Sequence, residues 1–297
     1  MTSLVKVGDS TYVVRGSPST LIHVVSGEAV LVDPGHGRKR HKVIRQALKA
    51  LNASVAAVVL THYHSDHIEA TDRVRGGAEV VASRADTPFV EDPYLRVAIS
   101  FGYPLSPESS LVPFKSPPVR VDRVVEPPAK LSGLDVELVP LPGHTRGQVG
   151  VLTGDGVLYL ADSAFGEGVI STYGIPYHYD VWSAMKTLDR VINDLAPSTY
   201  SLVLAHGPIA SKEPLIATLR RNEEVLKSVV EGVREVLRRG ALTAEGIASR
   251  LLRGMGIEPE PPTLMLASST VKSVLAGLHS RGEVEVKKGD SILWCLT

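Results

Sequence analysis

One segment of this 297-residue chain limits its possible folds more than any other. Residues 55–60, VAAVVL, are all apolar and of strand length, and THYHSDH follows directly at residues 61–67. An uninterrupted apolar strand is typical of a sheet that is covered on both faces. The polar residues after it are therefore expected at the end of a buried strand within a layered fold.

The rest of the first 210 residues has the patterning of such a fold. Period-two alternation predicts antiparallel strands at 11–16, 20–25 and 29–35, with the last two joined across residues 26–28. Apolar spacing predicts a helix within 38–51. Further strands are expected at 78–83, 136–141, 148–154, 156–162 and 201–207, and further helices at 68–77 and 181–195. This alternation implies a layered α/β architecture rather than an all-β barrel.

Residues 86–130 interrupt this pattern because they contain nine prolines. Such a density prevents long regular elements and predicts a mostly irregular excursion around a short helix near residues 94–100. The segment is either surface decoration or a lid over a site, and the sequence does not choose between them.

The C-terminal third differs in kind. Residues 213–240 form one amphipathic helical stretch that ends at a glycine. Two helices follow, one capped by Thr243 and one within 269–282, and then a hairpin at 283–295 that turns at Lys288-Gly289-Asp290. Two helices followed by a two-stranded wing is the order of a winged helix. The expected domains are thus 1–210, a helical connector at 211–240 and a winged-helix-like domain at 241–297.

The histidine cluster indicates a metal site. His62 and His64 are one residue apart, so on extended chain their side chains leave the same face and can converge on one ion. Asp66 and His67 come after the strand has ended, where the turn can direct them to a second ion. A lone histidine is more often structural, but four ligand-type side chains within six positions make that interpretation unfavourable.

Two neighbouring ions need more ligands than this cluster holds. Three more candidates occur later: His144 in LPGHTRG, Asp162 after VLYLA, and His206 after SLVLA. Each follows an apolar strand, so all three can emerge at the same sheet edge. The seven predicted ligands form a binuclear site with one carboxylate left to bridge: His62, His64, Asp66, His67, His144, Asp162 and His206.

With these residues in view, the chain resembles the metallo-β-lactamase-fold hydrolases. Their H-x-H-x-D-H motif matches residues 62–67, their later His, Asp and His match residues 144, 162 and 206, and their strand-end aspartate matches Asp33. The resemblance covers residues 1 to about 210 and implies an αββα sandwich with the metals at one edge. It implies that His62, His64 and His144 hold one ion, that Asp66, His67 and His206 hold the other, and that Asp162 bridges them.

The expected activity is metal-dependent hydrolysis, most simply with two zinc ions, although iron or manganese suits the same ligand types. An ion pair lowers the pKa of a shared water to about 7 and polarises a carbonyl or phosphoryl oxygen. Asp66 is the expected catalytic residue, which orients this water and moves its proton. Asp33 either supports a ligand imidazole or caps the turn before Pro34-Gly35. His178 either reaches the substrate or, as the preferred interpretation, is a partly buried surface residue.

The ligand set does not choose a subclass. The helical connector and the wing are similar to the lactamase-like endoribonucleases, whose GEG loop and RN pair resemble residues 166–168 and Arg221-Asn222. The favoured substrate on that resemblance is single-stranded RNA, and a glyoxalase-II-like thioester hydrolase is the alternative. Residues 241–297 hold six basic and six acidic side chains, so the wing is less basic than a nucleic-acid-binding module should be. A packing or dimerisation module is the preferred interpretation of this segment.

Two other classes stay open. A dioxygenase would hold a single iron through His62, His64 and Asp162, and a non-catalytic regulator would bind DNA through its wing. The chain carries 32 basic and 32 acidic residues, so no overall field attracts it to nucleic acid or membranes. Its single cysteine, Cys295, and the absence of an apolar signal or membrane segment predict a cytoplasmic, unanchored protein, either monomeric or homodimeric.

Overall fold

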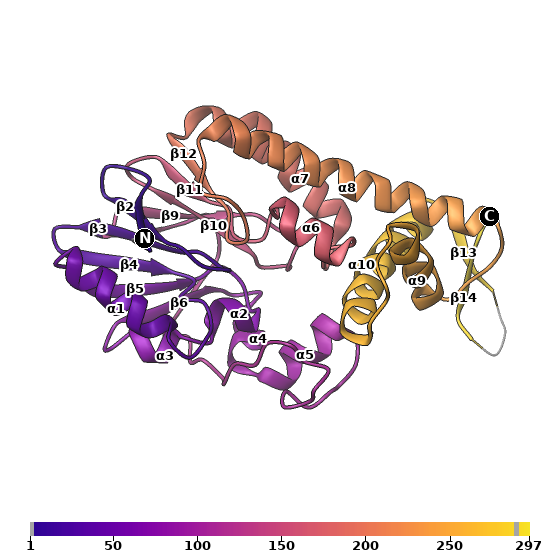
Figure 1. The fold of residues 1–297 in the computed structure, drawn as a ribbon, viewed down its shortest axis with the longest axis horizontal. Coiled ribbons are helices and arrows are strands. Elements are labelled where there is room, and N and C mark those ends of the chain that lie inside the picture. The colour runs from indigo at the N-terminus through magenta and orange to yellow at the C-terminus, as the bar shows by residue number, and fades with distance from the viewer. Residues whose placement is uncertain (1–2, 288–290) are drawn as a thin grey trace.

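The computed structural model describes residues 3–287 and 291–297. Its centre consists of two β-sheets packed face to face (Figure 1). The first sheet has seven strands in chain order: β1 (Leu4–Lys6), β2 (Thr11–Val14), β3 (Thr20–Val25), β4 (Glu28–Val32), β5 (Ser54–Leu60), β6 (Glu79–Ser83) and β7 (Arg123–Val125). The second has the order β12 (Ser201–Val203), β11 (Val157–Tyr159), β10 (Val149–Thr153), β9 (Val136–Pro140) and β8 (Ala129–Leu131).

The inner faces of the two sheets form one apolar layer. Val30, Val59 and Val81 from the first sheet pack in the same cluster as Leu138 and Val151 from the second. Side chains alternate along a strand, so the other residues of these strands face outward and require helices to cover them. This requirement produces the four layers of the domain.

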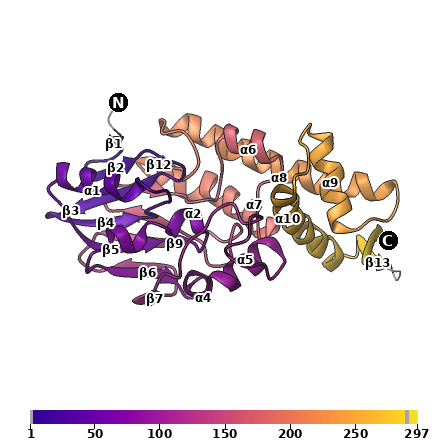
Figure 2. The same cartoon turned by 60° about the horizontal axis from the view of Figure 1, so that its bottom comes forward.

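Helices cover both outer faces. The first sheet packs against α1 (Arg40–Ala50), which buries Ile44 and Leu48. The second packs against α7 (Val181–Arg190) and the long α8 (Lys212–Arg238). The αββα sandwich predicted above is thereby confirmed. In Figure 1 the strands lie between α1 and α8, and Figure 2 shows the same elements after a turn of 60°.

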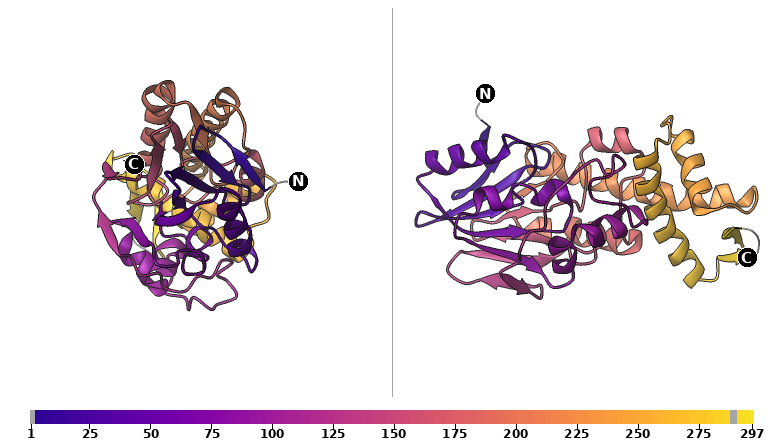
Figure 3. Two further views of the ribbon diagram at one scale, coloured as in Figure 1. Left: turned by 90° about the vertical axis from the view of Figure 1, so that its left-hand side faces the viewer. Right: turned by 90° about the horizontal axis from the view of Figure 1, so that it is seen from below.

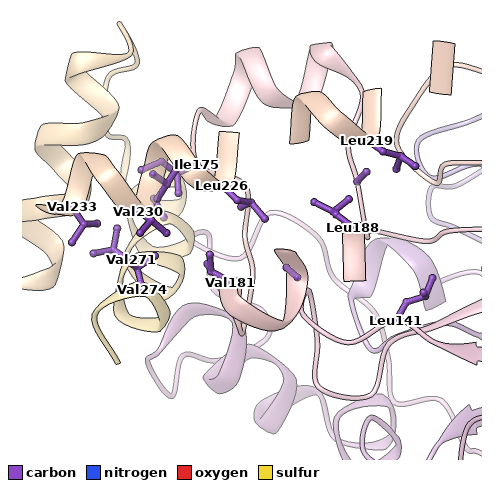
Figure 4. Packing of buried hydrophobic residues seen from close by; sticks show 14 of the residues in the cluster. Leu141, Ile175, Val181, Leu188, Leu219, Leu226, Val230, Val233, Val271 and Val274 are labelled. Atoms are coloured by element: carbon purple, nitrogen blue, oxygen red, sulfur yellow. The ribbon is translucent and has the colours of Figure 1, made fainter. Parts of the chain in front are cut away.

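The apolar core beneath the second sheet continues into the C-terminal segment. Leu188 of α7 and Leu226 of α8 belong to the same buried cluster as Val271 of α10 (Pro261–Ser280) (Figure 4). Helix α9 (Ala244–Gly254) packs in this cluster through Ile247 and Leu252. The C-terminal segment is therefore packed against the N-terminal part and is not joined to it by a free linker, and Figure 3 shows it as an extension of the sandwich along α8.

The C-terminal elements occur in the predicted order. After α9 and α10 come β13 (Val284–Lys287) and β14 (Leu293–Leu296), which pair antiparallel. Thr243 caps α9 by accepting a hydrogen bond from the Gly246 amide, as expected. The predicted turn at Lys288-Gly289-Asp290 lies outside the described residues, and the winged-helix identity stays a prediction.

The predictions for residues 68–77 and 86–130 need correction. The first holds only one helical turn, α3 (Thr71–Val74), and another turn, α2 (Ser65–Ile68), ends at its first residue. The second holds α4 (Thr87–Glu91) besides the expected helix α5 (Pro93–Phe101), and also the edge strands β7 and β8. Strands of three residues at a sheet edge need few ladder hydrogen bonds, so the prolines between and before them do not prevent their formation. None of the described helices is long and apolar enough to cross a bilayer.

Candidate metal centre

Strand ends bring the seven predicted ligands to one edge of the sandwich. His62 and His64 follow β5, and Asp66 and His67 lie in α2, whose single turn starts immediately afterwards. His144 lies in the turn between β9 and β10, Asp162 follows β11, and His206 follows β12. Because β11 is parallel to β12 and antiparallel to β10, these three connections open toward the same side.

Four of these side chains form a first cluster of converging donor atoms, His62, His64, His144 and Asp162. His64 Nδ1 lies 3.1 Å from His62 Nε2 and 2.8 Å from His144 Nε2. Asp66, His67 and His206 form a second cluster. In it, His206 Nε2 lies 3.1 Å from His67 Nε2 and 3.2 Å from Asp66 Oδ2.

Asp162 stands between the two clusters. Its Oδ2 lies 3.3 Å from His144 Nε2 and 4.0 Å from His62 Nε2. Its Oδ1 lies 3.3 Å from His67 Nε2 and 3.7 Å from His206 Nε2. One carboxylate oxygen therefore serves each cluster, as expected of a bridging ligand.

The ring nitrogens of His62 and His144 that face away from the cluster are hydrogen-bonded to other groups, and these bonds fix the tautomer of each ring. Thr61 Oγ1 donates its only proton to Asp33 Oδ2, so it accepts from His62 Nδ1, which lies 3.1 Å away. His144 Nδ1 donates to the Tyr177 carbonyl at 2.8 Å. The Nε2 atoms of His62 and His144 thus carry lone pairs, and both point into the first cluster, toward His64 Nδ1.

Asp33 supports a ligand and is not one of the converging donors. Its Oδ2 accepts from His67 Nδ1 at 2.8 Å, which leaves His67 Nε2 directed at Asp162. The other oxygen, Oδ1, accepts from the Thr61 amide at 2.9 Å, and the Asp33 side chain is fully buried. The grouping of Asp33 with His62 and His67 is explained by this supporting contact. Of the two alternatives left open by the sequence, the structure favours the orienting role.

The protonation behaviour of the site suits cations. Burial lowers the pKa values of His62 and His144 well below the usual range and that of His64 to about 4, so these rings are neutral. Burial also opposes the charged form of His67, but the carboxylates of Asp162 and Asp66 outweigh it and raise its pKa well above normal. A positive charge is therefore favoured between these groups.

The donor set fits divalent metal ions. Imidazole nitrogens that both present lone pairs at about 3 Å repel unless a proton or a metal cation lies between them. Ligand atoms 2.0–2.2 Å from a tetrahedral ion stand roughly 3.3–3.6 Å apart, close to the separations seen here. In addition, Asp162 Oδ1 is buried and makes no well-aligned hydrogen bond among the described residues.

Several supporting residues were not found from the sequence. Ser17 Oγ lies 2.8 Å from His206 Nδ1, although 189 positions separate the two residues. Asp86 accepts from Thr145 Oγ1 at 2.6 Å and from the Gly147 amide at 2.8 Å, and so fixes the turn that carries His144. Asp86 follows a predicted strand, which was the one available signal, and no local pattern singles out Ser17.

His178 was predicted as a partly buried residue of the surface, and this was wrong because the side chain is fully buried. It is 2% exposed, and its ring centroid lies 5.7 Å from that of His144. Its amide donates to Thr270 Oγ1 of α10, which draws the segment after Pro176 inward. The surface prediction was wrong because α10, which lies some ninety residues later in the chain, covers this segment.

The GEG and RN residues have roles within the protein. The Asn222 amide donates to the Phe165 carbonyl and accepts from the Phe165 amide, at 2.8 and 2.9 Å. Arg221 lies 3.8 Å from Glu167 and 3.7 Å from Glu224, in exposed ion pairs. These contacts tie α8 to the loop after Asp162 and account for both residues without a nucleic acid.

A family model described as the Metallo-beta-lactamase superfamily matches residues 12–197. An uncharacterized protein of Mycobacterium tuberculosis is 34% identical over 146 residues, which cover 46% of this chain and 57% of that protein. A hydroxyacylglutathione hydrolase of Prochlorococcus marinus is 25% identical over 192 residues, 61% of each chain. The chain thus spans somewhat over half the length of these curated relatives.

Two solved structures resemble the whole chain. A metallo-beta-lactamase family protein from Thermus thermophilus aligns with a TM-score of 0.68 and 18% identity, over 99% of this chain and 97% of the other. A beta-lactamase domain protein from Burkholderia ambifaria aligns with a TM-score of 0.67 and 20% identity, over 99% and 93%. At these identities the likeness establishes the fold, including the C-terminal extension, and nothing of the activity.

Proposed function

The chain belongs to the metallo-beta-lactamase superfamily, and from this premise we propose that it is a metal-dependent hydrolase of carboxylic esters or thioesters. The observation that carries the proposal is the pair of donor clusters joined by Asp162. His62, His64 and His144 would hold one divalent cation, and Asp66, His67 and His206 the other. Zinc suits these ligands best, with iron or manganese as alternatives.

Cations held there would lower the pKa of a water molecule and polarise the oxygen of a substrate carbonyl. The chain's own side chains would orient the water molecule and move its protons. Asp66 lines the cavity beside the clusters. Burial alone would raise its pKa, but His67 and His206 hold it well below the usual range, so Asp66 is ionised and can orient a water through its carboxylate.

Thioester hydrolysis has support from the relatives, because several are named hydroxyacylglutathione hydrolases. The endoribonuclease subclass, which the sequence favoured, stays a prediction. Its two distinguishing signatures, the GEG loop and Arg221-Asn222, make the internal contacts described above. Single-stranded RNA therefore enters the test below as the competing substrate.

The test is a panel assay of the zinc-loaded protein against acyl thioesters, carboxylic esters, lactones and single-stranded RNA, together with elemental analysis. We expect about two metal ions per chain and turnover of esters or thioesters. Asp66→Asn should retain the fold and lose at least a hundredfold in kcat, the range typical of general acid–base groups. Asp72→Asn, which changes an exposed carboxylate, is the matched control.

Three outcomes would contradict the proposal. RNA cleavage without ester cleavage supports the endoribonuclease. One iron per chain with oxygen uptake supports the dioxygenase. Full activity of Asp66→Asn removes the role given to this carboxylate.

A further inference from the structure

A cavity of about 210 Å³ opens beside the two donor clusters. His64, Asp66 and His206 lie at its inner end. Its other walls come from α5, the proline-rich segment after it, α6 (Glu167–Tyr173) and α10. The apolar side chains that carry the argument are Val97, Phe101, Val112, Phe165, Val169 and Leu266.

The proline-rich segment is thus a wall of the site and not surface decoration. Val112 is 5% exposed and packs with Val97 and Phe101 of α5 in a small apolar cluster. Phe165, which precedes α6, packs in a second small cluster with Ile170 of α6 and Val225 of α8. A substrate that reaches the donor atoms through this cavity therefore lies between two apolar clusters.

Arg96 is the charged wall residue outside the donor clusters, and its guanidinium is already occupied. Nε donates to the Phe89 carbonyl at 3.0 Å, Nη2 to the Val90 carbonyl at 3.2 Å, and Nη1 to Ser65 Oγ at 3.2 Å. These carbonyls belong to the last turn of α4, whose negative end stabilises the cation. Arg96 is 2% exposed, so it holds α4 and α5 together and offers little to a ligand.

Two serine hydroxyls of the wall are likewise paired. Ser100 Oγ donates to the Arg96 carbonyl at 2.9 Å, and Ser17 Oγ lies 2.8 Å from His206 Nδ1. A buried polar group that is already hydrogen-bonded gains little from a polar ligand. The cavity beyond the donor atoms thus favours an uncharged, apolar occupant.

Helix α10 closes the cavity from the C-terminal segment. Leu266 lines it, and the following turn is tied to the catalytic domain. Ser269 Oγ donates to the Ser100 carbonyl at 3.1 Å, and Thr270 Oγ1 donates to the Pro176 carbonyl at 3.0 Å. These bonds fix this wall relative to the donor atoms, so the C-terminal segment takes part in selecting the substrate.

We infer that the cavity binds an uncharged apolar group of about six to eight carbon atoms attached to the scissile ester or thioester, and that α10 forms part of this specificity pocket. The size follows from the volume, because 210 Å³ holds roughly seven groups of water size, about 30 Å³ each. The apolar group is either the acyl chain or the leaving group. The inference depends on the proposed hydrolase function, and its tests are chosen to separate the two.

The first test compares two substrate series with the zinc-loaded protein. One series varies the acyl chain of p-nitrophenyl esters from two to twelve carbons, and the other varies the alcohol of acetate esters over the same range. In the series that matches the pocket, kcat/KM should rise roughly fourfold per methylene up to about eight carbons and then level off, the gain expected for burial of a methylene. An eight-carbon chain that ends in a carboxylate should react at least tenfold more slowly than its methyl-ended counterpart.

The second test reads binding without turnover. Octanamide should bind the metal-free protein in isothermal titration calorimetry at least tenfold more tightly than butanamide. Val97→Trp fills the cavity and should abolish this preference, whereas Leu95→Trp, on the same helix but 47% exposed, should keep it. Leu266→Trp places the same bulk on α10, at a half-buried position that tolerates it, and should also abolish the preference. Melting temperatures identify any variant that has failed to fold.

Cleavage of esters with no dependence on chain length in either series overturns the inference and leaves the proposed function standing. A preference for the carboxylate-ended chain overturns it as well, in favour of recognition by Arg96. Octanamide binding that Val97→Trp and Leu266→Trp abolish, without cleavage of any ester, supports the pocket and refutes the proposed function.

Discussion

The buried carboxylate of Asp86 offers the sharpest test of how the site is held. Asp86 is 1% exposed, and it spans the turn that carries His144 by accepting from Thr145 Oγ1 and the Gly147 amide. Burial raises its pKa from 3.8 to about 6, against the hydrogen bonds, which lower it. Asp86→Asn keeps the shape and one acceptor but removes the ionisation.

Proton linkage determines whether the variant gains or loses stability relative to the parent as pH rises. A carboxyl group with a raised pKa in the folded state stabilises the fold fully below its unfolded-state pKa of 3.8, and this contribution is lost as pH rises through about 6. At about 1.4 kcal/mol per pKa unit, the difference corresponds to about 3 kcal/mol. The variant lacks this loss, so its free energy of unfolding relative to the parent should increase with pH by that amount. About 2 kcal/mol of the change should fall between pH 4.5 and 7.

The assay is urea unfolding of both chelator-treated proteins across this range, with the difference in unfolding free energy plotted against pH. In this difference, the contributions of all groups that titrate alike in both proteins cancel. Asp194→Asn, which changes an exposed carboxylate, should give a flat line. A flat line for Asp86→Asn as well would show that Asp86 is not buried as an ionisable group, and the account of the His144 turn would fail with it.

Three further predictions follow from single contacts. Asp33→Asn removes the acceptor that orients His67 and should weaken zinc affinity roughly 10- to 100-fold in chelator competition, whereas Asp155→Asn, whose carboxylate pairs with Thr11, should leave it unchanged. Gly143→Ala places a Cβ 2.4 Å from Ala184 Cα at a backbone φ of +138°, so it should destabilise the fold by at least about 1–3 kcal/mol in urea, and an unaffected variant would contradict the packing of this turn. Leu226→Ala should lower the free energy of unfolding by about 2–5 kcal/mol and preserve a single unfolding transition, because the core is continuous from α7 to α10. Two separate transitions would contradict that continuity. Lys227→Ala, which changes an exposed side chain, is the control and should change the unfolding free energy little.

Sequence patterns predicted the parts of the structure that depend on neighbouring residues. The apolar run 55–60 is a central strand with parallel neighbours on both sides, because a continuous apolar pattern requires cover on both faces. The seven donor residues were found because each follows an apolar strand, and the ends of neighbouring strands meet at one sheet edge. The structure brings all seven together in two converging clusters.

The unpredicted parts depend on contacts between residues far apart in the chain. Three hydrogen-bonded pairs are examples: Ser17 with His206, Asp86 with Thr145, and Thr270 of α10 with the amide of His178. In each pair, one partner has no distinctive local sequence pattern. The wall of the cavity belongs to the same class, since Val97, Val112 and Leu266 look like ordinary core residues in the sequence. In the proposed pocket, substrate specificity would thus depend on residues that become neighbours only in the folded chain.

The charges of the site link its stability to metal and protons together. Asp33, Asp66 and Asp162 place three carboxylates around five imidazoles in a buried space. Without a cation, burial still opposes charge on His67 and His206, but the carboxylates raise the pKa of both rings. The proton on each Nε2 then lies where the proposed metal ligand would offer its lone pair, so metal and proton compete for the same atoms. Metal uptake must therefore release protons. When a chelator removes the cations, protons from solvent return to these nitrogens and balance the negative charge of the carboxylates.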